Sequence, residues 1–496
     1  MQSPWHTRGD EFVGDTGGDG RLYGIHSARF PHMRLLPARP TVSTVLLIAA
    51  LGSSVSAQSV DHATLVAQLD SIAASGVVEN RAVGIVAAVV RGNDTLLMKG
   101  YGRADVEWNI PMPNDAVLEI GSITKQFTAA AILQLRDEGK LSLDDAITKW
   151  LPDFDTRGNK VTLRRLLDHT SGIVGITEIP EFGLLAINPR FPRDSAYALI
   201  NRQQFQFRTG EAQIYNNSAF WLLGLVVEKA SGMTYEDYVE KKIFAPLGMT
   251  RSMYCNSNEN VERRAHGYGI RNGDIRRAPT NVHTWPFSAG SLCSTAGDMV
   301  TWLTALHGGK VLSPKSYAEM ITPAKLNDGT VLGYGMGLAV ANDVRGLRAI
   351  GHGGAITGFT AEAVWYPDAK SAIVVLMNSN GNISPGAIAG ELAAELLPWK
   401  RPAFKAFTGD AAPLVGRYTG PARGRDMTIE VTQGAQGAGL MVSANGSPPR
   451  PLAWEEEWTF RQGSALLHFR RSGDSGPATE LRFHGGSSAY YILKRQ

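Results

Sequence analysis

The sequence has little of what marks several protein classes. Its 496 residues include only two cysteines, its 49 Lys+Arg nearly balance its 46 Asp+Glu, and 8% are aromatic. A net charge of +3 excludes a strongly basic nucleic-acid tail and implies no acidic partner. With 43% hydrophobic residues, the chain is too apolar for a disordered protein. Its length permits about three domains, or one large domain and a small one.

Long hydrophobic runs are also lacking. The most hydrophobic stretch, residues 42–52, is shorter than the roughly 20 residues that a membrane-spanning helix needs. Read from Met33, the chain shows a basic segment, this apolar stretch and small residues ending at Ala57, which is the pattern of a signal peptide. We therefore expect residues 1–57 to be an extension and signal peptide, with the true start at Met33 and cleavage after Ala57. The alternative is a disordered cytoplasmic tail on a weak anchor.

Export decides how the two cysteines are interpreted. The mature chain would be periplasmic or secreted without a membrane span, and an oxidising compartment would allow Cys255 and Cys293 to pair. Such a bridge would close a loop that the chain-entropy description values at roughly 4 kcal/mol. Neither cysteine lies in a C-x-x-C motif or has histidines at metal-binding spacing. Two separately buried thiols remain the alternative.

The order of patterns along the chain predicts an α/β (α+β) fold. Helical spacing at 60–75 is followed by two strand patterns, 82–90 and 94–102, joined as a hairpin. Residues 115–310 are mainly helical, and strand patterns return from about 334 until a helix at 387–397. Strands from both ends would form one mainly antiparallel sheet flanked by the terminal helices, with a large helical insertion. This catalytic domain would span residues 58–398.

The C-terminal part has a different pattern. Residues 399–412 are irregular and marked by prolines at 398, 402 and 413, which predicts a linker. From 413 to 496, short strand-like runs are separated by Gly, Pro and Ser turns, which is typical of a small all-β barrel or sandwich. Trp454 and Trp458 have strand spacing there, and we expect them in its core rather than on a sugar.

One serine has the setting of a nucleophile. Ser122 lies at the start of a predicted helix, from Ile123 to Glu138, and Lys125 follows three residues later. This spacing places both side chains on one helix face, so that the amine can take the hydroxyl proton. A Ser-x-x-Lys pair also arises by chance, and a capping serine beside a solvated lysine is the alternative.

Two further patterns follow downstream. Tyr215 and Asn217 lie in a loop before a predicted helix, and His352 is followed by two glycines at the end of a strand pattern. His169 lies at the end of a predicted helix, where a histidine usually satisfies carbonyl groups. The sequence has no G-x-S-x-G, H-E-x-x-H or G-K-[ST] motif, so it does not indicate an α/β-hydrolase, a zinc enzyme or a nucleotide-binding protein.

Ser-x-x-Lys, Tyr-x-Asn and His-Gly-Gly in this order resemble the three active-site elements of the serine β-lactamase and penicillin-binding-protein superfamily. The likeness is greatest to the class C β-lactamase type, with its relatives among D-aminopeptidases, D-Ala-D-Ala carboxypeptidases and esterases. It runs from about residue 60 to 397, through phrases such as F-A-P-L-G-M-T, and implies a β-lactamase/transpeptidase-like fold.

The resemblance also implies an acyl-enzyme mechanism without cofactor or metal. Ser122 would attack a carbonyl carbon, Lys125 would be the general base, and Tyr215 would pass the proton to the leaving group. The remaining roles would be substrate binding by Asn217, which could instead hold Lys125, substrate binding by His352 and Gly354, and an oxyanion hole formed by the backbone N–H groups of Ser122 and Ala355.

The third element departs from the Lys-Thr-Gly of β-lactamases and penicillin-binding proteins. His352 stands where a lysine would grip a substrate carboxylate, and histidine is mostly neutral at pH 7. We therefore expect hydrolysis of an ester or of a D-amino-acid amide or peptide, with β-lactamase or D-Ala-D-Ala carboxypeptidase activity as the alternative. A non-catalytic penicillin-binding-like sensor is a third possibility. The partner would be a small molecule or peptide, without nucleic acid, and the sequence leaves the oligomeric state open.

Overall fold

The computed structural model describes residues 61–185, 192–256, 258–343, 345–398, 407–434, 439–463, 465–473, 475–486 and 489–496. The predicted N-terminal extension and signal peptide, with the Met33 start and the cleavage site, lie outside these residues, as do positions 399–406 of the predicted linker. The domain boundaries and export therefore stay predictions. In the described part of the chain, no helix is both long and apolar enough to cross a membrane.

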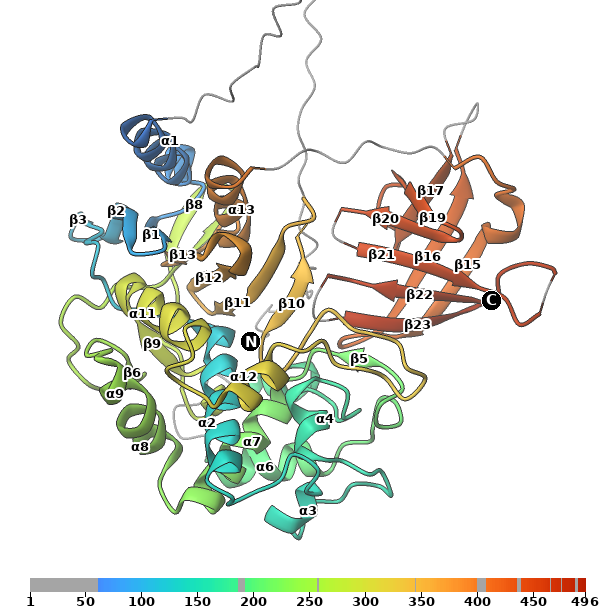
Figure 1. Cartoon of the computed structure of the whole chain (residues 1–496), viewed down its shortest axis with the longest axis horizontal. Coiled ribbons are helices and arrows are strands. Elements are labelled where there is room, and N and C mark those ends of the chain that lie inside the picture. The colour runs from blue at the N-terminus through green and yellow to red at the C-terminus, as the bar shows by residue number, and fades with distance from the viewer. Residues whose placement is uncertain are drawn as a thin grey trace, which may run out of the picture. The chain divides into compact units, whose positions relative to one another are not determined.

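A central sheet joins strands from distant parts of the sequence. Within the described ranges it has seven strands in the order β10-β11-β12-β13-β1-β2-β3. The central pair is antiparallel, with Ile85 opposite Met377 and Arg91 opposite Ser371. Figure 1 shows the blue N-terminal strands beside the orange later ones. The strands are β1 (Gly84–Arg91), β2 (Asp94–Asp105), β3 (Ile110–Pro111), β10 (Ala339–Asn342), β11 (Arg348–Ile356), β12 (Phe359–Tyr366) and β13 (Ser371–Met377).

Helices cover both faces of this sheet. The first and last helices of the region, α1 (His62–Ser75) and α13 (Pro385–Leu396), pack together on one face through Leu69 and Leu392 (Figure 1). On the other face lie α11 (Ala296–His307) and the central helix α2 (Thr124–Asp137), which is buried from Thr124 to Leu133. Strands covered on both faces are apolar along their whole length, which explains the uninterrupted run of β1 and β13.

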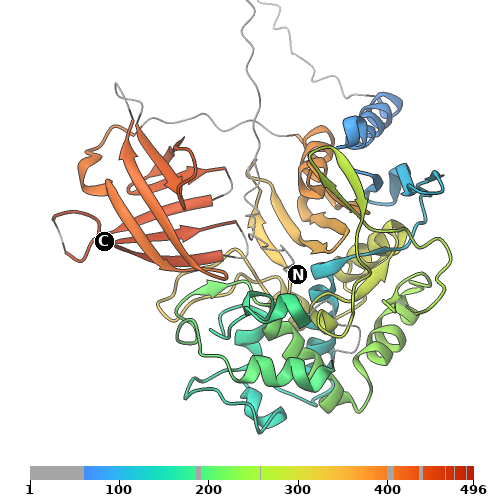
Figure 2. The ribbon, with the colours of Figure 1, turned by 180° about the vertical axis from the view of Figure 1, so that it is seen from behind.

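The middle of the sequence forms the predicted helical insertion. Its longest helix, α7, carries a capping side chain at Asn216 and ends at Gly232, whose φ of 72° suits glycine. Figure 2 shows this green region from behind. The helices are α3 (Ile147–Trp150), α4 (Leu163–Leu167), η3 (Ile176–Glu178), α5 (Phe182–Leu185), α6 (Arg193–Asn201), α7 (Asn217–Ser231), α8 (Tyr235–Val239), η4 (Glu240–Phe244), α9 (Ala245–Leu247), α10 (Phe287–Gly290) and α12 (Pro314–Met320).

Short strands connect this insertion to the sheet. The strands β4 (Leu118–Glu119), β9 (Leu292–Ser294) and β6 (Met253–Tyr254) form a small sheet in the order β4-β9-β6. The others are β5 (Gln213–Ile214), β7 (Tyr268–Arg271), β8 (Asp274–Arg277) and β14 (Ser379–Asn380), and single 3₁₀ turns are η1 (Val78–Asn80), η2 (Gly121–Ile123), η5 (Pro367–Ala369) and η6 (Ala412–Leu414).

The structure contains the predicted disulfide. Cys255 is bonded to Cys293, and both lie in a small buried apolar cluster that includes Val117. The bond joins β9 to the residue that follows β6, so it clamps the three-stranded sheet whose first strand leads into Ser122. The two buried, separate thiols of the alternative interpretation are absent at these positions.

Removal of this bond is expected to lower stability without changing the site chemistry. The variant Cys255→Ala/Cys293→Ala keeps the buried cluster apolar and removes the link that closes a 38-residue loop. In the chain-entropy description this lowers the free energy of unfolding by about 4 kcal/mol. Urea unfolding followed by fluorescence, with and without reductant, measures the effect. Equal midpoints for the wild type in both conditions would contradict a stabilising disulfide.

The C-terminal part is a nearly closed antiparallel sheet, as the sequence predicts. In the described residues the order is β18-β17-β16-β15-β23-β22-β21-β20-β19, with β5 added beside β23. Tyr418, Phe460 and Leu481 fill its interior, and Trp454 and Trp458 pack against that core. The strands are β15 (Gly416–Pro421), β16 (Asp426–Gln433), β17 (Leu440–Ala444), β18 (Arg450–Pro451), β19 (Ala453–Glu456), β20 (Thr459–Gln462), β21 (Ala465–Arg470), β22 (Glu480–His484) and β23 (Ala489–Arg495).

Candidate active site

Ser122 lies on a tight turn between β4 and the buried helix α2. The turn begins at Gly121, which has a φ of 51°, a left-handed conformation that other residues adopt at a cost. A Cβ atom at Gly121 would lie 2.8 Å from the backbone nitrogen of Ala355. Glycine at 121 therefore allows both the sharp turn and the close approach of strand β11.

Lys125 is fully buried and hydrogen-bonded at three points. Its Nζ lies 3.1 Å from Ser122 Oγ, 2.8 Å from Asn217 Oδ1 and 2.8 Å from the backbone carbonyl of Ala289. The structure thus brings the predicted base into hydrogen-bond distance of the predicted nucleophile. The sequence allowed Asn217 either to bind substrate or to hold Lys125. In the structure its Oδ1 accepts a hydrogen bond from Lys125 Nζ.

The surroundings of Lys125 favour a neutral amine. Burial and the positive charge of Arg423 lower the pKa of Lys125 well below its usual value, and Glu178 counteracts this in part. A neutral amine has two N–H donors and one lone pair. The Asn217 and Ala289 oxygens accept from the two donors, so the lone pair faces the Ser122 hydroxyl. This is the arrangement that a general base needs.

The Tyr215 ring lies between the Lys125 amine and the Arg423 guanidinium. Lys125 Nζ is 4.7 Å from the ring centroid and Arg423 Cζ is 5.0 Å from it. Burial raises the pKa of the Tyr215 hydroxyl, while Ser122 and the charge of Arg423 act in the opposite direction. This hydroxyl is buried and makes no hydrogen bond of good geometry among the described groups, while Ser122 is close enough to lower its pKa. Its proton is therefore held only weakly by the protein.

A polar chain leads from Lys125 to the C-terminal domain. The amide nitrogen of Asn217 donates to Thr177 Oγ1 at 3.1 Å, and that hydroxyl donates to Glu178 Oε1 at 2.7 Å. The same carboxylate oxygen accepts from Arg423 Nε at 2.7 Å. Arg423 follows strand β15, so the C-terminal domain contributes a charged side chain to this site.

His352 is held by other protein groups. Its Nδ1–H donates to the carbonyl of Gly353, and its Nε2 accepts from the Tyr334 hydroxyl at 3.0 Å. Tyr334 in turn accepts from Nε2–H of His169 at 3.2 Å, and Nδ1 of His169 accepts from the backbone N–H of Asn216 at 3.2 Å. The donor and acceptor of each hydrogen bond in this series are fixed, because the carbonyl at one end can only accept and the backbone N–H at the other end can only donate.

Both histidines of this hydrogen-bonded series, His169 and His352, are neutral. Burial is the main cause that lowers the pKa of His352 to about 3, although its bond to Gly353 counteracts it, and burial likewise lowers the pKa of His169. A proton on Lys125 would lower both pKa values further. The sequence assigned the His352 side chain to substrate binding, but both its ring nitrogens are engaged within the protein. His169 follows a helix end as predicted, but it holds Asn216 in the loop beside Tyr215.

Gly354 and Ala355 bring strand β11 against the serine turn. A Cβ at Gly354 would lie 2.0 Å from the carbonyl oxygen of Ile120, so only glycine permits this contact. The backbone nitrogen of Ala355 is next to Gly121, which suits the predicted oxyanion hole of the Ser122 and Ala355 N–H groups. The role of Gly354 in this geometry is close packing of two backbones.

Several residues of the site were missed by the sequence analysis. They lie in the short helices η3 and α10, in the loop before β10 and in the C-terminal domain, without a motif that marks them: Thr177, Glu178, Ala289, Tyr334 and Arg423. Nothing in the one-dimensional pattern indicates which β-domain turn reaches the insertion.

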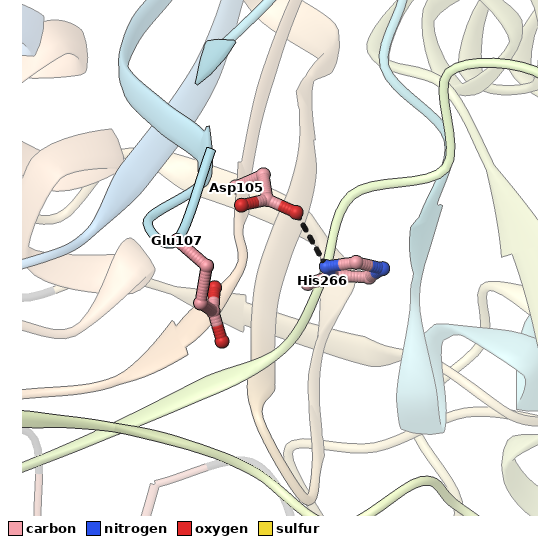
Figure 3. Close-up of side chains that lie close together, drawn as sticks. All are labelled: Asp105, Glu107 and His266. Atoms are coloured by element: carbon pink, nitrogen blue, oxygen red, sulfur yellow. Dashed lines mark ion pairs between the residues drawn. The ribbon is translucent and has the colours of Figure 1, made fainter. Parts of the chain in front are cut away.

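One cluster in the described residues has the composition of a metal site. Asp105, Glu107 and His266 place their ligand atoms within 4.8 Å of one another, and Figure 3 shows the ion pair between Asp105 and His266. The Glu107 carboxylate accepts from the Tyr268 hydroxyl and pairs with Arg277 at 3.4 Å. Protein donors thus already occupy the carboxylates, and we assign no metal to the cluster.

The fold and site define a serine hydrolase of the Ser-x-x-Lys type. Residues 66–397 match the family described as Beta-lactamase. The chain therefore belongs to the beta-lactamase family, and the expected fold and family are confirmed.

Among curated proteins, the chain is 27% identical over 358 residues to penicillin-binding protein 4* of Bacillus subtilis (strain 168), covering 66% of this chain and 77% of that protein. Among solved structures, it resembles a D-stereospecific amidohydrolase from Streptomyces sp. at 29% identity and TM-score 0.58, covering 67% of this chain and 98% of that one. It also resembles an octameric penicillin-binding protein homologue from Pyrococcus abyssi, at 26% identity and TM-score 0.60, covering 86% of this chain and 100% of that one.

Proposed function

We propose that the protein hydrolyses a D-amino-acid amide or peptide, or an ester, through an acyl-enzyme on Ser122. The observation that carries the proposal is the buried Lys125, whose two N–H donors are taken by Asn217 and Ala289 while its third position faces Ser122 Oγ. A lysine held in this way can take a proton only at the position that faces the serine.

The proposed reaction has two steps. In the first, Ser122 Oγ attacks the carbonyl carbon and its proton passes to Lys125, while the backbone N–H groups of Ser122 and Ala355 stabilise the oxyanion. The bond to the leaving group breaks as Tyr215 gives it a proton and takes the serine proton from Lys125 in return, which leaves Lys125 neutral again. In the second step, water attacks the acyl carbonyl carbon and gives a proton to Lys125; the ester bond to Ser122 breaks, Ser122 Oγ takes that proton, and the acid product leaves.

The substrate class is supported by two observations. The Streptomyces structure that this chain resembles is a D-stereospecific amidohydrolase. In addition, His352 is a neutral, internally bonded side chain, so the third element itself has no cation that would restrict the site to substrates with a carboxylate. Penicillin binding stays the second candidate, because the curated relative is a penicillin-binding protein.

A substrate panel tests this proposal. The wild type and Ser122→Ala would be compared on a p-nitrophenyl ester, D-alanyl p-nitroanilide and nitrocefin, together with labelling by a fluorophosphonate. We expect turnover of the ester and the D-anilide above that of nitrocefin, with label on the wild type only. Preferred turnover of nitrocefin would favour a β-lactamase, and an unlabelled, inactive wild type would favour the non-catalytic sensor.

We also propose that the protein is exported. The Cys255–Cys293 disulfide supports an oxidising compartment, and the signal-peptide pattern ends at Ala57. N-terminal sequencing of the protein recovered from its native compartment is expected to begin at Gln58. A mature chain that still carries residues 34–57 would contradict cleavage there.

A further inference from the structure

The C-terminal domain contacts the candidate site beside Tyr215. Strand β23 pairs with β5 through Ala489 opposite Ile214, which directly precedes Tyr215. Arg482 Nη1 adds an ion pair to Asp328 at 2.6 Å. The domain is thus docked on the segment that carries the second active-site element, and the turn after β15 brings Arg423 to the same tyrosine.

Arg423 is oriented by protein groups but remains accessible. Its Nε donates to Glu178 at 2.7 Å and its Nη2 donates to Thr177 at 3.4 Å. These bonds use two of the five N–H groups of a guanidinium. The side chain of Arg423 is 43% exposed, whereas that of Glu178 is 9% exposed. A buried carboxylate therefore aims a guanidinium that solvent, or a ligand, can reach.

Arg423 is the cation of this site that persists during the reaction. Lys125 must be neutral to accept the serine proton, and His352 is neutral with both ring nitrogens engaged. A guanidinium stays charged at every physiological pH and matches a carboxylate with two parallel hydrogen bonds. The positive charge that the third element lacks is thus supplied from another domain.

The position of Arg423 also selects one side of the scissile bond. Tyr215 is the residue proposed to protonate the leaving group, and Arg423 Cζ lies 5.0 Å from its ring centroid. The Arg423 guanidinium, which lies beside Tyr215, is therefore placed to contact the leaving group of the substrate rather than its acyl group. A leaving group that carries a carboxylate is an amino acid at the C-terminus of a peptide.

We propose that Arg423 of the C-terminal domain binds the carboxylate of the leaving group, and so makes peptides with a free C-terminal carboxylate the preferred amide substrates. This inference rests on the proposed acyl-enzyme function. It assigns to the β domain the substrate recognition that the His-Gly-Gly element does not provide.

The test compares two substrates that differ only in this charge. N-acetyl-D-alanyl-D-alanine and its C-terminal amide would be measured for kcat/KM and as competitive inhibitors of p-nitrophenyl ester hydrolysis. The wild type is expected to prefer the carboxylate by about tenfold to a hundredfold, the usual range for a charge-assisted hydrogen-bonded pair. Because Arg423 also influences Lys125, the ratio between the two substrates is the informative quantity; a change in the base alters both rates alike.

Two variants of Arg423 and a control variant of a second arginine make the test specific. Arg423→Gln is expected to reduce the preference to near one while the amide is still bound, and Arg423→Lys to restore part of it. Arg417→Gln removes an arginine that is 62% exposed on β15, and it is expected to keep the wild-type ratio.

Two outcomes would overturn the inference. One is a wild type without preference for the carboxylate in either turnover or inhibition, and the other is an unchanged preference in Arg423→Gln. Failure of the proposed function is distinguishable, because then the wild type would neither hydrolyse the p-nitrophenyl ester nor be labelled at Ser122.

Discussion

Replacement of Ser122 by alanine is expected to abolish hydrolysis and covalent labelling. The hydroxyl is the atom proposed to form the acyl bond, and Lys125 Nζ is 3.1 Å from it. Loss of a nucleophile in a serine hydrolase typically lowers kcat by 10⁴-fold or more, to about the level that binding and the oxyanion hole alone provide. Steady-state kinetics on a p-nitrophenyl ester and intact-protein mass spectrometry after fluorophosphonate treatment measure the two effects.

The control for this variant is another serine in a helix. Ser195 lies on the surface of α6, and Ser195→Ala is expected to retain wild-type activity and label. A Ser122→Ala protein that still gains the mass of the label would place the nucleophile elsewhere. Ser122 is only half-buried, so we expect Ser122→Ala to fold as the wild type does. An unchanged far-ultraviolet circular dichroism spectrum checks this.

Replacement of Lys125 is expected to have the second largest effect. Lys125→Met fills a similar volume but cannot accept a proton, and Lys125→Arg keeps a positive charge that no physiological pH removes. Both are expected to lower the acylation rate about 10³-fold, within the range of general-base catalysis. Stopped-flow labelling measures this rate, and Lys149→Met, at a lysine that is 56% exposed, is the matched control. A Lys125→Arg variant that acylates at the wild-type rate would exclude Lys125 as the base.

The pH dependence provides an independent measure of the same residue. Burial and the charge of Arg423 hold the pKa of Lys125 well below its usual value, so the neutral form is present at pH values where an ordinary lysine is charged. The acylation rate should rise with pH as Lys125 loses its proton and fall as the pH drops below neutrality. Saturating kinetics with rate-limiting chemistry that stay flat from pH 6 to 9 would contradict this assignment.

The sequence predicts the parts of the fold that rest on local patterns. The helix beginning near Ser122 and stopping before Gly139, the hairpin of β1 and β2, and the run of strands in the C-terminal part are each marked by periodicity and turn residues. The disulfide was predicted from the inferred oxidising compartment, and the structure contains it. One sheet built from strands at both ends of the region was expected, and the pairing of β1 with β13 is the contact that joins them.

The rest of the site depends on contacts that have no local signature. Tyr334 occupies a loop position before β10, and it is recognised only when its hydroxyl is seen between His169 and His352. Arg423 is one of many arginines in the chain until the β domain is placed against Tyr215. The predicted substrate contact of His352 assumed a free ring nitrogen, and the number of free donors on a side chain depends on packing that sequence spacing does not encode.

The pairing of β23 with β5 ties activity to the order in which the chain folds. The residues paired here belong to two different domains, and domains generally fold as units before they dock. The central sheet and the serine helix can therefore be complete while the Tyr215 segment still lacks its outer strand. During refolding, recovery of hydrolysis is expected to lag behind recovery of secondary structure, because the docking of β23 on β5 limits the rate at which activity returns.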